Sequence, residues 1–288
     1  MKNAPIRCPE VAWGTTLAEF VMTETTATDQ QRQAARALAC LDLTSLNLDD
    51  TPERIDALCD RALSPVPGID VHPAAVCIYP RFVAQARARL QGSGIAVAAV
   101  ANFPLGSAPV DEVIVEVEGA IADGVDEIDV VFPFRAYLAG DHLAAGELVR
   151  QVSEVCHSGS HPKMLKVILE TGVLHEAETI KAAAAVAIAN GADFLKTSTG
   201  KLEPAATPEA ASALLDVIGA AQRSGQRIGL KVAGGVKTVA DAAVHLDLAV
   251  RCLDDAHPGN FRFGASGLLN DIVRVLGSAS DTQLSADY

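Results

Sequence analysis

Short runs of apolar or β-branched residues alternate with longer Ala-rich runs of helical period from Asp29 to about Gly277. Helix-start signals stand between the short runs at Thr51-Pro52-Glu53, at Thr207-Pro208-Glu209 and at Thr238 ahead of Asp241. Each short run is therefore a candidate strand followed by a helix. The eight predicted strands are Leu41–Leu46, Ala75–Tyr79, Ala96–Asn102, Glu127–Phe132, Met164–Glu170, Asp193–Ser198, Ile228–Val232 and Phe261–Gly264.

An eightfold βα repeat predicts an α/β fold in which the strands are parallel, because parallel neighbours need long crossover connections. Such a repeat closes most naturally into a (β/α)8 TIM barrel. A doubly wound open sheet is the alternative, but no GxGxxG opens a helix after the first strand, so its dinucleotide-binding form has no support. The repeat has no composition break, which predicts one barrel domain at 29–277, an N-terminal extension at 1–28 and a C-terminal tail at 278–288.

The charge balance of the chain limits the classes of partner that it can bind. The 23 Lys and Arg residues against 36 Asp and Glu residues give a net charge of −13, and no basic cluster interrupts this acidity, which disfavours nucleic acid and anionic membranes. No apolar stretch approaches the roughly 20 residues of a membrane span, and no signal peptide is visible. The six cysteines are scattered and are expected to be reduced thiols. We expect a cytoplasmic protein.

Charged residues occur within strands that should be apolar on both faces. Any one of them could belong to a structural ion pair. Six together, several near the carboxyl ends of barrel strands, favour an active site, because this architecture builds its sites there. The six are Asp42, Asp129, Lys166, Glu170, Lys196 and Lys231.

Two of these lysines lie on adjacent predicted strands, Lys196 in FLKTSTG and Lys231 in GLKVAGG. A lysine with an ordinary pKa of about 10.4 is protonated at neutral pH and cannot attack a carbonyl. Burial and a neighbouring cation both disfavour the ammonium form. The pair therefore predicts a nucleophilic amine that forms a Schiff base.

Glycine-rich segments follow the sixth, seventh and eighth predicted strands. Glycine lets backbone N–H groups approach an anion, and the helix after Gly264 would point its amino terminus at the same place. These segments predict a phosphate site, although glycine after a strand is also common in simple tight turns. They are Thr199-Gly200-Lys201, Gly234-Gly235-Val236-Lys237 and Gly264-Ala265-Ser266-Gly267.

The blocks LDLTSLN, VCIYPRF, NFPLGS, DEIDVVFPF, LKVILETG, ADFLKTSTGK, GLKVAGGVKT and RFGAS occur in this order, and together they resemble the 2-deoxy-D-ribose-5-phosphate aldolase family. The resemblance covers roughly Ala39 to Gly277. It implies a class I aldolase on a (β/α)8 barrel that needs no cofactor and no metal. The implied reaction cleaves 2-deoxyribose 5-phosphate to glyceraldehyde 3-phosphate and acetaldehyde, in deoxyribonucleotide catabolism.

The resemblance also implies a role for individual residues. Lys196 falls on the Schiff-base lysine, Lys231 on the lysine that perturbs its pKa and relays protons, and Asp129 on the general acid/base. Asp42, Thr44 and Lys166 fall on substrate-binding positions that support the catalytic hydrogen-bond network. The phosphate positions fall on Gly200, Lys201, Gly234, Gly235, Val236, Lys237, Gly264, Ala265, Ser266 and Gly267, with Thr199 beside them.

Some features depart from the family or leave alternatives open. An arginine occurs in the family where this chain has Lys237, and a serine where it has Gly267, which affects phosphate affinity. Tyr288 is either a proton-transfer residue or an inert terminus. Cys77 is expected to be a small core residue. Dimers are common in the family, and composition marks no interface. The rival functions are a Schiff-base aldolase for another phosphosugar and a non-catalytic phosphosugar-binding barrel.

Overall fold

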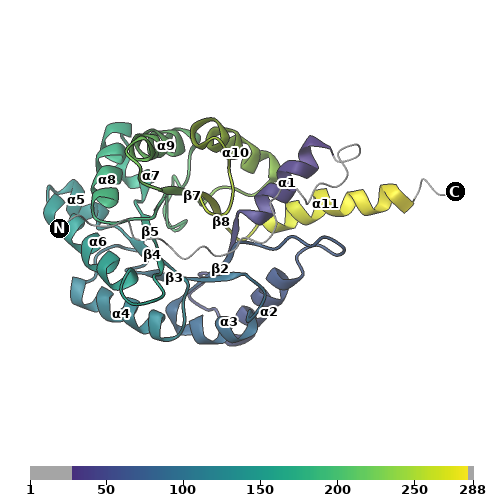
Figure 1. Cartoon of the computed structure of the whole chain (residues 1–288), viewed down its shortest axis with the longest axis horizontal. Helices are drawn as coiled ribbons and strands as arrows, with labels where there is room; N and C mark the ends of the chain where they lie inside the picture. Colours follow the sequence, from purple (N-terminus) through teal and green to yellow (C-terminus); the bar gives the residue numbers. More distant parts are fainter. Residues whose placement is uncertain (1–27, 285–288) are drawn as a thin grey trace.

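The computed structural model describes residues 28–284, and their side chains as far as Gly277. Eight parallel strands pair in sequence order, and β8 also pairs with β1, so that the sheet closes on itself (Figure 1). The predicted (β/α)8 TIM barrel is confirmed. The strands are β1 Leu41–Thr44, β2 Ala75–Ile78, β3 Ala96–Ala101, β4 Glu127–Val131, β5 Met164–Ile168, β6 Phe194–Lys196, β7 Gly229–Ala233 and β8 Phe261–Ala265.

Helices surround the barrel, and the three predicted helix-start threonines are their N-caps. The side chains of Thr51, Thr207 and Thr238 each accept a hydrogen bond from a backbone N–H three residues further on. The helices are α1 Asp29–Ala39, α2 Pro52–Leu63, the 3-10 turn η1 Pro80–Phe82, α3 Val83–Arg89, α4 Val110–Ala122, α5 Phe134–Leu138, α6 His142–Cys156, α7 Thr171–Leu174, α8 Ala177–Ala189, α9 Pro208–Arg223, α10 Val239–Leu253 and α11 Leu268–Leu284.

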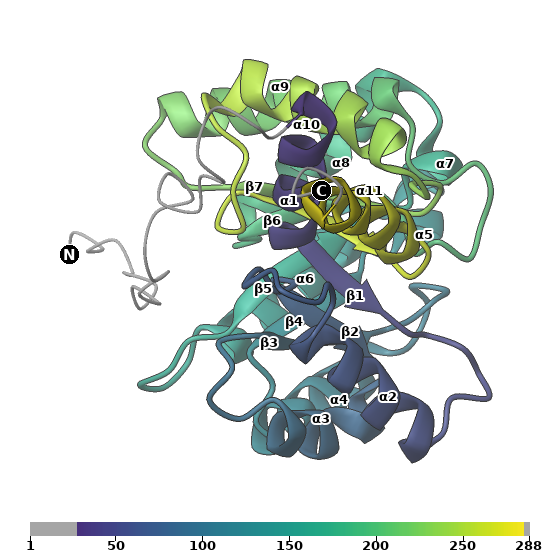
Figure 2. The ribbon, with the colours of Figure 1, turned by 90° about the vertical axis from the view of Figure 1, so that its right-hand side faces the viewer.

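The strand pattern did not predict α1, which precedes the first strand. Thr28 begins this helix with a capping box that includes Gln31, and the helix buries Ala34, Ala37 and Leu38. It packs against α10 and α11 (Figure 2). Helix α11 continues past residue 277, where the predicted tail begins, as far as Leu284. Residues 1–27 and Tyr288 lie outside the described residues.

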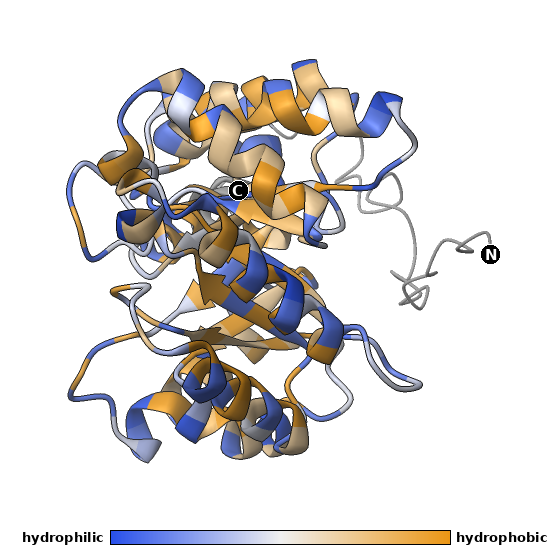
Figure 3. Cartoon of the chain, turned by 90° about the vertical axis from the view of Figure 1, so that its left-hand side faces the viewer, coloured by the Kyte–Doolittle hydropathy of each residue, from blue (hydrophilic) through white to orange (hydrophobic). Residues whose placement is uncertain are grey.

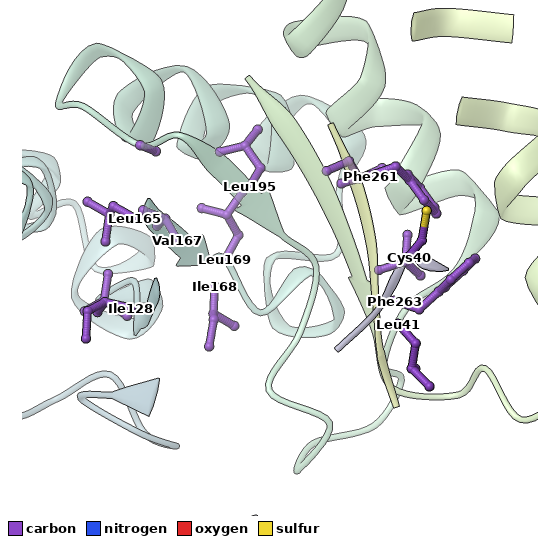
Figure 4. Packing of buried hydrophobic residues seen from close by; sticks show 14 of the residues in the cluster. Cys40, Leu41, Ile128, Leu165, Val167, Ile168, Leu169, Leu195, Phe261 and Phe263 are labelled. Carbon is purple, nitrogen blue, oxygen red and sulfur yellow. The ribbon is translucent and has the colours of Figure 1, made fainter. Parts of the chain in front are cut away.

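Apolar side chains form two separate clusters. The larger cluster lies between the barrel and its helices. The strands are mainly hydrophobic, and the helices carry both hydrophobic and hydrophilic residues (Figure 3). Figure 4 shows part of this layer, including Leu165 and Val167 of β5 and Phe261 of β8. The smaller cluster consists of Leu46, Ala75, Cys77, Ala98 and Val100. Its members on β2 and β3 are in register with Asp42 and Asp129, which places them inside the barrel.

Several strands end before their predicted limits, and these ends form the mouth of the barrel. Strand β6 ends at Lys196, and the hydroxyl of the next residue, Thr197, donates to the Ala233 carbonyl and accepts from the Ala233 N–H. After β5 the backbone turns away at Glu170, whose φ of 55° lies in the left-handed region. None of the helices that the structure describes is both long and apolar enough to cross a membrane.

Candidate active site

Seven charged side chains gather inside the barrel, and none is more than 3% exposed. They come from β1 and from β4 to β8, so the strands that lack them are the two that carry the small apolar cluster. Burial of so many charges is costly unless each is paired. The seven are Asp42, Glu127, Asp129, Lys166, Lys196, Lys231 and Arg262.

Asp129 is the centre of this charged cluster and contacts three lysines. Its Oδ1 lies 2.7 Å from Nζ of Lys166, and its Oδ2 lies 2.8 Å from Nζ of Lys196 and 2.7 Å from Nζ of Lys231. Strand register causes the convergence, because Asp129 is paired with Lys166 across β4 and β5, and Lys196 with Lys231 across β6 and β7. Both lysines of the predicted pair therefore share one carboxylate oxygen.

Arg262 binds the two carboxylates of the cluster that Lys196 does not pair with. Its Nη1 donates to Oδ1 of Asp42 at 2.6 Å, and its Nη2 donates to Oε1 of Glu127 at 2.9 Å. The second oxygens of these carboxylates reach the lysines, since Asp42 Oδ2 lies 2.5 Å from Lys231 Nζ and Glu127 Oε2 lies 2.6 Å from Lys166 Nζ. All seven groups thus form one connected network.

The floor of this network is aromatic. The guanidinium carbon of Arg262 lies 6.0 Å from the centroid of the Phe194 ring. The ring fits because β7 begins with Gly229, where a Cβ atom would come within 2.4 Å of two ring carbons. A side chain at Gly229 would therefore displace Phe194 and the arginine above it.

The charges of the network do not balance, and this decides the protonation of Lys196. Four basic side chains face three carboxylates, so one positive charge is in excess. Burial disfavours the ammonium of Lys231, but Asp129 and Asp42 outweigh it and raise the pKa of Lys231 well above its ordinary value. Lys196 pairs with Asp129 alone among the described residues, and burial lowers its pKa.

The three lysines also hold Asp129 in its ionised form. Burial alone would raise the pKa of Asp129, but the charges of Lys166, Lys196 and Lys231 outweigh it and keep that pKa well below the ordinary value. Lys196 ends its strand at the mouth of the barrel, and its side chain is 3% exposed while those of Lys166 and Lys231 are 0% exposed. Lys196 is thus the lysine closest both to the neutral form and to the mouth.

The predicted phosphate segments lie next to one another above β6, β7 and β8. A Cβ built on Gly234 would lie 3.2 Å from Cα of Gly200 and 2.6 Å from Cβ of Ala205, and Gly234 has a φ of 83°, so this position requires glycine. Gly264 is in register with Ala233. Ser266 and Gly267 are exposed just before α11, a helix of 17 residues whose amino terminus faces this side.

The other predicted residues differ in what they contact. Val236 is buried, Ala265 is half-buried and Lys237 is exposed. Lys201 reaches back over the mouth, where its Nζ donates to the Leu46 carbonyl at 2.6 Å. The Thr44 hydroxyl donates to the Asp42 carbonyl at 2.8 Å.

The sequence predicts Thr199 beside the phosphate positions and Cys77 as a small core residue. The N–H and hydroxyl of Thr199 donate to Oε2 of Glu170, whose Oε1 has no hydrogen-bond partner in the described part of the chain. Cys77 is fully buried, with Sγ 3.8 Å from Asp129 Oδ2, and burial raises the pKa of its thiol. Tyr288 lies outside the described residues. Between residues 28 and 277, no group of His, Cys, Asp and Glu side chains is arranged to hold a metal ion.

The sequence analysis did not assign Glu127 and Arg262 to the site, although both belong to the network. The signal was present, because Glu127 is two residues before Asp129 and Arg262 is two residues before Gly264, so each shares a strand face with a residue that was predicted. Arg262 also stands between Phe261 and Phe263, where an unpaired charge would not be tolerated.

Known proteins place this barrel among aldolases. The family model described as DeoC/LacD family aldolase matches residues 36–271. A deoxyribose-phosphate aldolase of Agrobacterium fabrum is 45% identical over 258 residues, which cover 88% of this chain and 96% of that protein. A structure from Toxoplasma gondii assigned as a deoxyribose-phosphate aldolase is 25% identical with a TM-score of 0.74, and it covers 86% of this chain and 96% of its own. The tetrameric deoxyribose phosphate aldolase of Aeropyrum pernix, 23% identical, has the same fold with a TM-score of 0.68, over 88% of this chain and 99% of its own. The extent of these matches, over a barrel that carries buried lysines at its mouth, shows that the chain belongs to the DeoC/LacD aldolase family.

Proposed function

We propose that this enzyme is a class I aldolase that reversibly cleaves 2-deoxy-D-ribose 5-phosphate to D-glyceraldehyde 3-phosphate and acetaldehyde through a Schiff base on Lys196. The observation that carries the proposal is the buried network with one excess positive charge, whose least stabilised cation stands at the barrel mouth. The relative of Agrobacterium fabrum, a deoxyribose-phosphate aldolase at 45% identity, supports this substrate.

The first step joins the sugar to the enzyme. The lone pair of neutral Lys196 Nζ attacks the C1 aldehyde of the open-chain sugar, and the carbinolamine then loses its hydroxyl as water after a proton transfer. The product is an iminium with a positive charge at the Lys196 nitrogen. Asp129 Oδ2, which lies 2.8 Å from that nitrogen, stabilises this charge.

The second step breaks the C2–C3 bond, because acetaldehyde retains C1 and C2. A base removes the proton of the C3 hydroxyl, the oxygen electrons form the new carbonyl, and the C2–C3 electrons move into the iminium to give an enamine. Glyceraldehyde 3-phosphate leaves, C2 takes up a proton, and water hydrolyses the acetaldehyde iminium. We assign the base to Asp129 acting through a water, the proton relay to Lys231, and assistance at C2 to Tyr288.

The remaining residues bind and orient the substrate in this proposal. The backbone of Thr199, Gly200 and the glycine-rich segments after β7 and β8 binds the phosphate, and the α11 terminus adds partial positive charge. Lys201 and Lys237 add full charges. We assign Asp42 and Lys166, which lie within the buried network, to supporting its hydrogen bonds, and Thr44 to binding a substrate hydroxyl.

We also propose that residues 29–277 form the catalytic domain, with 1–28 as an extension and 278–288 as a tail. The enzyme would work in the cytoplasm, a location that fits the free thiols of the five cysteines that the structure describes. A homodimer is the assembly that the family resemblance favours.

Purified enzyme incubated with 2-deoxyribose 5-phosphate and EDTA tests the proposal, with glyceraldehyde 3-phosphate coupled to a nicotinamide-linked readout. The wild type and Lys181→Ala, which removes a surface lysine paired with Asp216, should cleave the sugar, and Lys196→Ala should lose at least about a thousandfold in rate. Borohydride added with substrate should attach a two-carbon or sugar adduct to Lys196. Cleavage that persists in a folded Lys196→Ala protein contradicts the assignment, and a wild type active only on another phosphosugar supports the rival aldolase.

A further inference from the structure

Arg262 is a buried cation that the proposed mechanism does not use. It is the largest fully buried side chain among the described residues, and its Nε donates to the Pro258 carbonyl at 2.5 Å while its two other nitrogens bind carboxylates. A guanidinium keeps its proton in proteins, whereas a buried lysine can lose its own. The excess charge of the network therefore has to be relieved at a lysine and not at Arg262.

We propose that Arg262 is a positioning residue of this aldolase, whose permanent charge and grip on Asp42 and Glu127 force Lys196 into the neutral amine form. The inference rests on the proposed function, because a neutral Lys196 matters as the nucleophile of that reaction. Arg262 touches no substrate in this scheme and acts through the two carboxylates.

The hydrogen-bond geometry explains why the neutral lysine is Lys196 and neither of the others. Arg262 takes one oxygen of Asp42 and leaves the other to Lys231, and it takes one oxygen of Glu127 and leaves the other to Lys166. Lys231 then contacts Asp42 besides Asp129, and Lys166 contacts Glu127 and, at 3.8 Å, Asp42 besides Asp129. Lys196 contacts Asp129 alone in the described part of the chain, and it shares Oδ2 with Lys231.

Charged and titratable groups reach the network from most of the strands. The groups that face the network are Asp42 from β1, Cys77 from β2, Glu127 and Asp129 from β4, Lys166 from β5 with Glu170 at its end, Lys231 from β7 and Arg262 from β8. Burial raises the pKa of the Cys77 thiol, so it stays uncharged, and Glu170 is hydrogen-bonded to Thr199 outside the ion pairs. The balance is therefore set by four basic groups and three carboxylates.

Two single variants and their double variant separate charge from structure. Arg262→Gln leaves three lysines facing three carboxylates, so all three can stay charged. Glu127→Gln increases the excess of positive charge. The double variant Arg262→Gln/Glu127→Gln restores the wild-type excess. Arg223→Gln, which removes an exposed positive charge from α9, is the matched control.

The readout is the pH at which the Lys196 amine becomes reactive. Each protein is treated with formaldehyde and cyanoborohydride between pH 6 and 10, and methylation of the Lys196 peptide is measured by mass spectrometry, since only the neutral amine reacts. We expect the midpoint to rise by about one pH unit in Arg262→Gln and to fall by about one unit in Glu127→Gln. The double variant should have the midpoint of the wild type, because its excess charge is the same. The Arg223→Gln control should also leave the midpoint unchanged.

A structural role for Arg262 makes different predictions. It would make the double variant the most damaged of the set, and the midpoints of the single variants would not move in opposite directions. Either result overturns the proposal. Circular dichroism checks folding, and if Arg262→Gln alone does not fold, the comparison of Glu127→Gln with the wild type and the double variant decides the question.

The labelling experiment does not depend on sugar cleavage, so it remains valid if the substrate assignment fails. The rate of 2-deoxyribose 5-phosphate cleavage is measured in parallel. At pH 7 we expect about tenfold slower cleavage in Arg262→Gln, because a midpoint one unit higher leaves about a tenth of the neutral amine. A wild type that methylates as expected but cleaves no sugar refutes the proposed function and leaves the role of Arg262 standing.

Discussion

The two walls of the barrel interior differ in almost every physical respect. Strands β2 and β3 present Ala75, Cys77, Ala98 and Val100, all at most 1% exposed. The opposite wall, from β4 round to β1, presents the seven charged side chains of the network. The first wall obeys the ordinary rule that interiors are apolar and closely packed. The second is tolerated because each of its charges has at least one partner of opposite sign.

This difference shows how the fold separates stability from chemistry. The apolar wall packs against Asp129, where Cys77 Sγ lies 3.8 Å from Oδ2, and it contributes no charge of its own. The charged wall is held by neighbouring strands whose registers bring lysine beside carboxylate. Substitutions on the two walls should therefore fail in different ways.

The largest effect is expected from Asp129→Asn, which removes the carboxylate that three lysines share. The buried ammonium groups of Lys166 and Lys231 would then face an uncharged amide, and the free energy of unfolding should fall by about 3–5 kcal/mol. The cleavage rate should fall by roughly a hundredfold or more. Urea unfolding and the coupled assay measure the two effects. Asp216→Asn, at an exposed ion pair of α9, is the control and should change neither by much.

Acid should weaken the charged wall more than the apolar one. Burial opposes ionisation of Asp42 and Asp129, but Lys231, Arg262 and the other lysines outweigh it and lower the pKa of both carboxyls below the ordinary value of 3.8. Such groups stabilise the fold fully above pH 3.8 and lose this contribution as the pH falls through their lowered values. The free energy of unfolding should stay nearly level from pH 7 to 5 and drop below pH 3.8. A protein whose stability already falls by several kcal/mol between pH 7 and 5 would contradict this account.

The same comparison explains how much of the site was predictable. Strand order placed Lys196 and Lys231 on adjacent strands, and the barrel rule marked Asp129 as one of six charged residues of a candidate active site, because strand period and strand order can be read from the sequence. The fold followed from the same pattern, with eight strands close to their predicted positions. Helix α1 was not predicted, since its hydrophobic face is filled only by contact with α10 and α11.

The sequence does not show how the carboxylate oxygens of the network are divided among the lysines and Arg262. Lys231 pairs with Asp42 as well as with Asp129, and Lys196 does not. This difference depends on contacts between side chains of strands that lie far apart in the sequence, such as β1 with Asp42 and β7 with Lys231. The same holds for Arg262, which looks like an isolated charge in strand β8 until Glu127 and Asp42 are placed beside it.

The apolar wall should respond to substitution by loss of packing alone. Val100→Ala deletes two buried methyl groups opposite Asp129, at a site that is 1% exposed, and should lower the free energy of unfolding by about 1–3 kcal/mol. The cost should be the same at pH 5 and pH 8, because no titrating group is removed. A shift in the pH at which Lys196 becomes reactive would show that the two walls are coupled. Exposed Val115→Ala on α4 is the matched control.

The smallest effect is expected from an ion pair outside both walls. Nε2 of His157 lies 2.9 Å from Oδ2 of Asp193, and their side chains are 18% and 26% exposed. The hydrogen bond that His157 donates to the Asp193 carboxylate raises the pKa of His157 above its ordinary value of 6.5. A raised pKa means that the pair stabilises the fold fully below pH 6.5 and loses this contribution as the pH rises through the higher folded value. His157→Gln should therefore lower the free energy of unfolding by about 0.5–1 kcal/mol at pH 5.5 and by less at pH 9, measured in urea. Because this pair carries no excess charge into the barrel, the reactivity midpoint of Lys196 should not change. A larger stability loss than in Val100→Ala, or a moved midpoint, would mean that the influence of charge on Lys196 extends beyond the barrel interior.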